Sequence, residues 1–288
     1  GVPRLPLVQK TVECFYPGSS FPAISTTGRS CSLQCKHCAG KYLEGMIPAT
    51  SPEDLLSVAE ALAERGAKGF LLSGGVDPAG KVRLSEFTQA IETVKSTTDL
   101  RINAHMGLTP DDEVERLVSS GIDAFSIDVY GSNETIRDVL GLRAKVEDYM
   151  GVLESLERHR APIVAPHICI GIDGGRVKGE LEAVGRLVPF DPKVLVLISL
   201  IPTKGTAFSD VRPPSASDVT RVIGAARDSM PRTRIQLGCM RSKLDRTSEM
   251  SYIKAGLDGI VLPAAVTVEE LKGQGVLVRK RSTCCALV

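Results

Sequence analysis

The chain has 288 residues, eight cysteines and a formal net charge of +1 at pH 7. This length suits one large domain or two small ones, and the balanced charge argues against nucleic acid or an anionic membrane as a partner. No apolar run is long enough to span a membrane and no secretory signal opens the sequence. The cysteines therefore favour metal binding over disulfides, and the sequence predicts a cytoplasmic protein.

Short apolar or β-branched runs alternate along the chain with amphipathic stretches of helical period. Helices are expected at residues 52–65, 84–95 and 215–229, with Ser51 and Ser217 as N-caps of the first and third. Glycines in "RGAKG" and "SSGID" are expected to end helices before a following strand. The predicted strands are residues 22–27, 69–73, 101–106, 123–129, 163–171, 193–200, 234–239 and 259–262.

Eight such units in one series predict an α/β fold of the TIM-type (βα)8 barrel, full or nearly full. A doubly wound open sheet is the alternative. No linker interrupts the series, so one domain is favoured. We expect residues 1–271 to form the barrel with its N-terminal lead segment, and residues 272–288 to form a tail over the barrel mouth.

The stretch "CSLQCKHC" places Cys31, Cys35 and Cys38 in a C-x3-C-x2-C array directly after the first predicted strand. Barrel enzymes react at the C-terminal ends of their strands, so the array lies on the expected catalytic face. Three thiolates can hold a 4Fe–4S cluster and leave one iron open to a small chelating molecule. A zinc ion completed by His37 or by a distant cysteine is the alternative, but zinc sites usually show two cysteine pairs.

This array resembles the signature of the radical S-adenosylmethionine superfamily, and the resemblance covers most of the chain. It implies that S-adenosylmethionine chelates the open iron and is cleaved by one electron to a 5′-deoxyadenosyl radical. The position before the third cysteine is usually aromatic and lies by the adenine in that family. Here it is His37, for which an ordinary exposed loop histidine is the alternative.

Further segments resemble the same family at the ends of predicted strands. "LLSGG" resembles its glycine-rich methionine-binding segment, with Ser73, Gly74 and Gly75 at the key positions, although two glycines also suit an ordinary turn. "SIDV" resembles a segment of biotin and lipoyl synthases and assigns Asp128 to the ribose hydroxyls. "VLGLR" resembles the segment whose arginine binds the methionine carboxylate, which implies that role for Arg143; an exposed helix residue is the alternative.

The chain resembles biotin synthase but has no cysteine in its third and fourth predicted strands, where that enzyme holds its second cluster. "YPGSSFPAISTTG", "KYLEGMIPA", "GFLLSGG" and "LGCMR" look most like the smaller subunit of the two-subunit lipoyl synthase of some prokaryotes. That resemblance implies a sulfurtransferase of lipoate biosynthesis that acts on an octanoylated carrier protein or peptide. It also implies a second auxiliary 4Fe–4S cluster, a second radical SAM subunit, and an electron donor such as ferredoxin or flavodoxin.

Five cysteines lie outside the signature. By elimination and placement we expect the auxiliary cluster to be held by Cys14, Cys239 and the pair Cys284 and Cys285. Cys169 alternates with isoleucines in a predicted strand and is interpreted as a small core residue. Alternatives remain open: a radical enzyme without sulfur insertion (a mutase, methyltransferase or metallocofactor-maturation enzyme), a biotin-synthase-like sulfurtransferase, or a non-catalytic iron–sulfur carrier.

Overall fold

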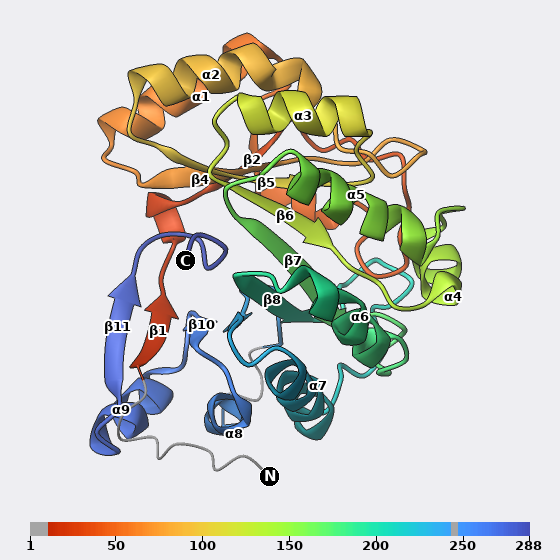
Figure 1. Ribbon diagram of the computed structural model, residues 1–288, viewed down its shortest axis with the longest axis vertical. Coiled ribbons are helices and arrows are strands. Elements are labelled where there is room, and N and C mark those ends of the chain that lie inside the picture. Colours follow the sequence, from red (N-terminus) through yellow and green to blue (C-terminus); the bar gives the residue numbers. More distant parts are fainter. Residues whose placement is uncertain (1–10, 243–246) are drawn as a thin grey trace.

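Eleven parallel strands form one curled sheet in the computed structural model, which describes residues 11–242 and 247–288 (Figure 1). Its strand order is β11-β1-β10-β9-β8-β7-β6-β5-β4-β2-β3. The strands are β1 Thr11–Phe15, β2 Ala23–Ser25, β3 Ile47–Pro48, β4 Gly69–Ser73, β5 Arg101–Met106, β6 Ala124–Asp128, β7 Val164–Ile170, β8 Val194–Ser199, β9 Arg234–Leu237, β10 Gly259–Val261 and β11 Leu277–Arg281.

Helices cover the outer side of the curled sheet (Figure 1). They are α1 Pro52–Glu64, α2 Thr88–Thr97, α3 Asp111–Ser119, α4 Asn133–Thr135, α5 Val146–Arg158, α6 Glu180–Leu187, α7 Ala216–Ser229, α8 Glu249–Ala255 and α9 Ala265–Gly273. None of the helices within residues 11–242 and 247–288 has both the length and the apolar composition of a membrane crossing.

The eight strands expected from the sequence are β2 and β4 to β10, and they pair in chain order, which confirms an α/β fold of TIM type. The sheet ends at β3 and β11, so the described strands form a curled rather than a closed sheet. Three strands were not expected: β1, β3 and β11. Strand β1 pairs with β10 on one side and with β11 on the other, and β3 pairs with β2. Strand β3 has only two residues, and β11 is mostly exposed, so neither shows a clear apolar alternation.

Helix termini follow the expected chemistry with one correction. Ser51 caps α1, because the Asp54 amide donates to Ser51 Oγ at 3.1 Å and the Asp54 carboxylate accepts from the Ser51 amide. Ser217 is not the cap of α7: the Asp218 amide donates to Ser215 Oγ at 3.1 Å instead. Helix α7 begins at Ala216, so Ser217 lies inside its first turn and Ser215 occupies the N-cap position. Gly66, with φ +73°, lies one residue beyond the C-cap of α1, as predicted.

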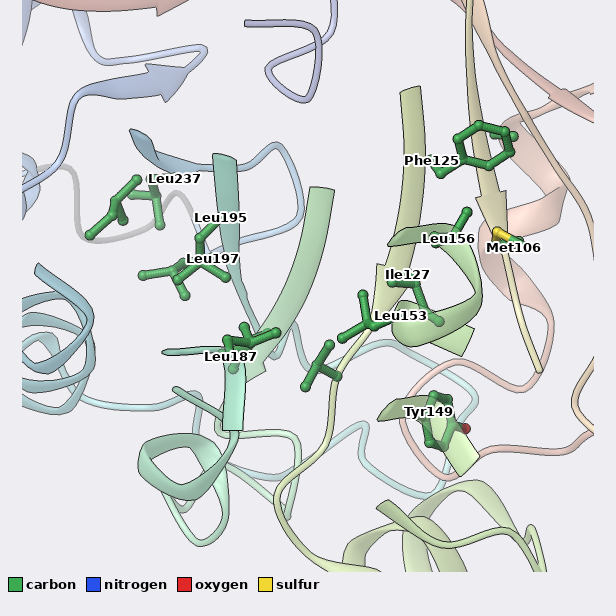
Figure 2. Close-up of a cluster of buried hydrophobic side chains, with 14 of the residues drawn as sticks. Met106, Phe125, Ile127, Tyr149, Leu153, Leu156, Leu187, Leu195, Leu197 and Leu237 are labelled. Atoms are coloured by element: carbon green, nitrogen blue, oxygen red, sulfur yellow. The ribbon is translucent and has the colours of Figure 1, made fainter. Parts of the chain in front are cut away.

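Alternation along the strands separates an apolar outer face from a more polar inner face. In β6, Phe125 and Ile127 are fully buried and join the main core, whereas Ser126 and Asp128 occupy the alternate positions. Figure 2 shows this core, in which α5 contributes Tyr149, Leu153 and Leu156. The chemistry-bearing side chains of the middle strands therefore lie inside the curl.

The C-terminal segment enters the curl after β11. Cys285 and Ala286 pack against Phe15 at the end of β1 and against Val194 and Val196 of β8. Leu287 packs beside Phe21 and Ala124, close to the starts of β2 and β6. We expected residues 272–288 as a tail over the barrel mouth. Part of that range is the paired strand β11, and its apolar last residues fill the inner side of the sheet.

Candidate active site

The signature cysteines lie in the loop that follows β2, as the sequence predicts. Cys35 is buried, and Cys31 and Cys38 are half-buried. The Ala39 amide donates to the Cys35 carbonyl oxygen at 2.9 Å, so the loop turns back on itself between the second and third cysteines. Cys35 Sγ also lies 3.6 Å from the Leu140 carbonyl oxygen, which ties the loop to the segment after α4.

Cys35, His37 and Cys38 form a group whose ligand atoms all lie within 4.8 Å of one another. A hydrogen bond from the Cys35 thiol, helped by His37 and opposed by burial, lowers the pKa of Cys38 to about 4. The same hydrogen bond, with burial, raises the pKa of Cys35, and Cys31 lies close enough for its charge to add to that rise. The lowered pKa of Cys38 favours its thiolate, the form that ligates iron. Three thiols in one loop fit an iron–sulfur cluster.

The glycine-rich segment after β4 packs directly on this loop. A Cβ on Gly75 would lie 2.0 Å from the Ser30 carbonyl oxygen and 2.7 Å from Cys31 Cα, so only glycine fits there. The Gly75 amide donates to Thr27 Oγ1 at 2.7 Å. Ser73 Oγ donates to the His105 carbonyl oxygen at 3.1 Å. The segment expected to bind methionine thus also sets the position of Cys31.

Asp128, expected at the ribose, lies at the end of β6 with its side chain 39% exposed. His105 Nε2 of β5 lies 3.5 Å from Asp128 Oδ1. Burial raises the pKa of Asp128, but the charge and hydrogen bond of His105 outweigh it, so the pKa is below its usual value. Burial lowers the pKa of His105, but the charge and hydrogen bond of Asp128 raise it by more. The pKa of His105 is therefore above its usual value. Each of the two groups therefore favours the charged form of the other.

The two interior histidines are the main residues that our sequence analysis missed. His167 of β7 pairs in register with Asp128, and its ring centroid lies 5.1 Å from that of His105. Burial, then the charge of His105, lowers the pKa of His167 to about 4. A signal was present in the sequence: N-x-H, S-x-D and H-x-C in three successive predicted strands put polar residues on one face of each.

Arg143 lies in the stretch between Leu140 and α5 and is exposed. None of the hydrogen bonds and ion pairs given for the described residues engages its guanidinium group. Three residues earlier, the Leu140 carbonyl meets Cys35, so Arg143 is carried by a segment that contacts the signature loop. That placement leaves its guanidinium group available for a carboxylate ligand.

The structure separates Cys14 from the other predicted auxiliary ligands. Cys14 is fully buried in the main core, while its neighbour Phe15 faces the tail. Burial, with the charge of Glu249, raises the pKa of Cys14 to about 11. Because neighbouring strand residues point to opposite faces, Cys14 faces the helices and does not meet the tail pair.

Cys284 and Cys285 lie together on the inner side of the sheet, whereas Cys239 is exposed. A hydrogen bond from Cys285 lowers the pKa of Cys284 to about 7 against the effect of burial, and Asn103 Nδ2 donates to Cys284 Sγ at 3.5 Å. The hydrogen bond with Cys284 and burial raise the pKa of Cys285. The charge of Cys239, which lies just after β9, adds a smaller contribution in the same direction. The interior thus holds a second group of thiols, the adjacent Cys284 and Cys285, separate from the signature.

Cys169, interpreted from the sequence as a core residue, is half-buried on the inner face of β7. Burial, followed by the charge of Asp128, raises the pKa of its thiol. Its exclusion from the auxiliary cluster remains a prediction.

A parallel, curled α/β sheet with a three-cysteine loop at the end of an early strand defines an enzyme that holds an iron–sulfur cluster at the open end of a barrel. Residues 25–182 match the family model of the Radical SAM superfamily. The chain belongs to that superfamily and is a biotin-synthase-like radical SAM enzyme. The family implies a 4Fe–4S cluster and S-adenosylmethionine, which the residues described above fit.

Curated relatives and solved structures agree with this assignment. The chain is 24% identical over 258 residues to biotin synthase of Christiangramia forsetii, covering 84% of this chain and 67% of that protein. It is 25% identical over 248 residues to biotin synthase of Synechococcus elongatus, covering 82% and 75%. The fold is similar to methylornithine synthase (PylB), with TM-score 0.64 and 16% identity over 96% of this chain and 85% of that one. It is also similar to HydG, a maturase of the [FeFe]-hydrogenase, with TM-score 0.65 and 16% identity over 93% of this chain and 64% of that one.

Proposed function

We propose that the protein is a sulfur-insertion enzyme of the lipoyl synthase type, which acts on an octanoyl chain attached to a carrier protein or peptide. A cluster held by Cys31, Cys35 and Cys38 would supply the electron that cleaves S-adenosylmethionine to the 5′-deoxyadenosyl radical. The remaining binding roles fall to His37 near the adenine, Ser73, Gly74 and Gly75 at the methionine, Asp128 at the ribose and Arg143 at the carboxylate. The radical would abstract hydrogen from the octanoyl chain.

The observation that carries this proposal is the second group of thiols inside the curl. Cys284 has a pKa near neutrality and is delivered by the tail to the same interior that holds Asp128 and His105. A radical enzyme that only rearranges its substrate needs no second thiol group there, whereas sulfur insertion needs a sulfur source close to the substrate. We therefore assign the proposed auxiliary cluster to Cys239, Cys284 and Cys285, and remove Cys14 from the set.

The surroundings of these thiols are apolar. Phe15, Val196 and Val261 pack with Cys285 in a buried cluster on the inner side of the sheet. Biotin synthase is the name that the curated relatives share, so insertion into a biotin precursor is the competing assignment. A second radical SAM subunit and an electron donor such as ferredoxin or flavodoxin remain part of the proposal.

The test is to reconstitute the protein anaerobically and supply S-adenosylmethionine, a reductant and a peptide with a perdeuterated octanoyl-lysine. We expect deuterium to appear in 5′-deoxyadenosine and sulfur to appear on the octanoyl chain, both by mass spectrometry. Cys284→Ser should still transfer deuterium but add no sulfur. Sulfur transfer to dethiobiotin with no reaction of the octanoyl peptide would contradict the lipoyl assignment, and deuterium transfer without sulfur would contradict sulfur insertion.

A further inference from the structure

We propose that an acidic electron-transfer protein docks on a basic surface beside the signature loop, formed by Lys36, Lys41 and Lys204 (the lysine surface). Lys36 and Lys204 are exposed, and the side chain of Lys41 is 37% exposed. This inference rests on the proposed function and deepens it, because it assigns the place at which the electron donor of that proposal binds.

Other segments pack against the signature loop but leave Lys36 open to solvent. The glycine-rich segment packs on the loop at Gly75. The Lys36 amide donates to the Val139 carbonyl oxygen at 2.9 Å, and the Phe208 amide, from the loop after β8, donates to the Lys36 carbonyl oxygen at 3.0 Å. The backbone of Lys36 is thus held on two sides while its side chain is exposed. Because Lys36 lies between the second and third cysteines, the surface next to them is basic.

The loop after β8 brings Lys204 to the same region. Tyr42 Oη and Thr203 Oγ1 form a hydrogen bond at 3.1 Å. A Cβ on Gly205 would lie 3.0 Å from Lys41 Cε and 3.4 Å from Lys41 Nζ, so the Lys41 ammonium group lies against the turn that follows Lys204. Lys41 and Lys204 therefore belong to two loops that contact each other beside the cysteines.

Tyr42 connects this surface to the cysteines. It is 37% exposed, and its ring centroid lies 6.3 Å from that of His37. Burial raises the pKa of Tyr42 against the Thr203 hydrogen bond, and the charges of Cys169 and Cys38 add to the rise. One side chain thus extends from solvent toward Cys38. Because electron tunnelling weakens steeply with distance, a protein docked at this surface is well placed to reduce a cluster in the signature loop.

The carboxylates nearby offset the positive charge of the lysine surface only in part. Lys41 Nζ lies 4.0 Å from Glu44 Oε1, and an exposed pair of this kind contributes little. The hydrogen bonds of Arg137 and, to a smaller extent, the charge of Lys36 lower the pKa of Asp138. Arg137 donates to both carboxylate oxygens of Asp138, at 2.7 and 3.0 Å, so that carboxylate is largely neutralised by the arginine.

The remaining charge favours an acidic partner. Among the ion pairs given for the described residues, none engages Lys36 or Lys204. Complementary charge steers an acidic protein to such a surface and raises the rate of encounter. A second copy of this chain would set lysines against lysines in a two-fold contact, which disfavours self-association at the lysine surface.

The experiment uses oxidised flavodoxin, an acidic protein that carries single electrons, and measures its binding to the anaerobically reconstituted protein by calorimetry. The test variant is Lys41→Glu/Lys204→Glu. Its matched control is Lys254→Glu/Lys272→Glu, which makes the same change in net charge at exposed positions of α8 and α9. We expect the test variant to bind about tenfold more weakly at low ionic strength, since charge steering changes association by that order. The control should bind as the parent does, and in about 1 M salt, where the Debye length is about 3 Å, the difference should vanish.

A second measurement follows delivery of the electron. With reduced flavodoxin as the only reductant, the test variant should form 5′-deoxyadenosine more slowly than the parent and the control. With dithionite, a small reductant that needs no docking surface, all three proteins should react equally. The dithionite reaction also shows that the test variant is folded and carries its signature cluster.

Three results would overturn the docking surface: equal weakening in the test variant and the control, flavodoxin binding by the parent that does not respond to salt, or a loss of the dithionite reaction in the test variant. The last result would mean that the lysines act on the cluster and not on a partner. Sulfur transfer enters neither measurement. A negative result here therefore leaves the sulfur-insertion assignment standing, and failure of sulfur insertion leaves the docking surface standing.

Discussion

Asp128 and His105 face each other inside the curl, and each shifts the pKa of the other toward its charged form. A carboxylate in that state can accept two hydrogen bonds from a ribose diol. Arg143, by contrast, is exposed in the loop before α5, with its guanidinium group positioned by a segment that contacts Cys35. Two of the proposed binding residues for S-adenosylmethionine therefore differ in setting. Asp128 lies at the end of β6 beside His105, and Arg143 lies in an exposed loop.

Replacing Arg143 by alanine should weaken S-adenosylmethionine binding by about 1.5–3 kcal/mol, the range for hydrogen bonds to charged groups. That range corresponds to roughly a 10- to 150-fold rise in the dissociation constant. Calorimetry under anaerobic conditions measures it directly.

The matched control for this loss is Arg116→Ala. Arg116 is also exposed and pairs with Asp112 at 3.2 Å on the outer helix α3, away from the signature loop. It should leave the affinity unchanged. An Arg143→Ala protein that binds S-adenosylmethionine as tightly as the parent would remove Arg143 from the site.

At the scale of structural elements, the glycine-rich segment packs the end of β4 against the cysteine loop. A Cβ at Gly75 would meet backbone atoms of Ser30 and Cys31, and backbone cannot rotate away as a flexible side chain can. Gly75→Ala should therefore displace Cys31 and lower iron incorporation at the signature. Iron analysis after reconstitution, with the yield of 5′-deoxyadenosine, measures the effect.

Gly151→Ala on α5 is the matched substitution, because nothing lies within 4 Å of its added methyl group. Within a helix, this change should stabilise the protein by about 0.5–1 kcal/mol and leave iron content unchanged. Equal iron in the Gly75→Ala and Gly151→Ala proteins would show that the close packing of the glycine segment does not position the cluster.

Sequence patterns predicted the elements whose signals are local. The three-cysteine spacing located the signature loop after β2, and alternation located the eight strands β2 and β4 to β10. The face of the sheet on which Cys14 lies could not be predicted without knowing that Cys14 belongs to β1. That strand is short, and its pairing with β10 and β11 joins segments that are distant in the sequence. The tail was equally hard to place, because Leu287 packs against Phe21 and Ala124, which are far away in sequence.

At the scale of the whole molecule, the curled sheet has two chemically distinct regions. The ends of β2, β4 and β6 hold the signature loop, the glycine segment and Asp128. The inner side, filled by the tail, holds Cys284 and Cys285 near His105 and Asn103. A substrate lying between these regions would be close both to the radical and to the proposed sulfur source, as a reaction with two partners requires.

The most direct test of this account is the reductive cleavage of S-adenosylmethionine by the wild-type protein and by the Cys31→Ala/Cys35→Ala/Cys38→Ala variant. Both are reconstituted anaerobically, supplied with dithionite and assayed for 5′-deoxyadenosine by liquid chromatography and mass spectrometry. The account predicts formation of 5′-deoxyadenosine by the wild-type protein and none above background by the variant. Undiminished formation by the variant would contradict the assignment of the radical chemistry to this loop.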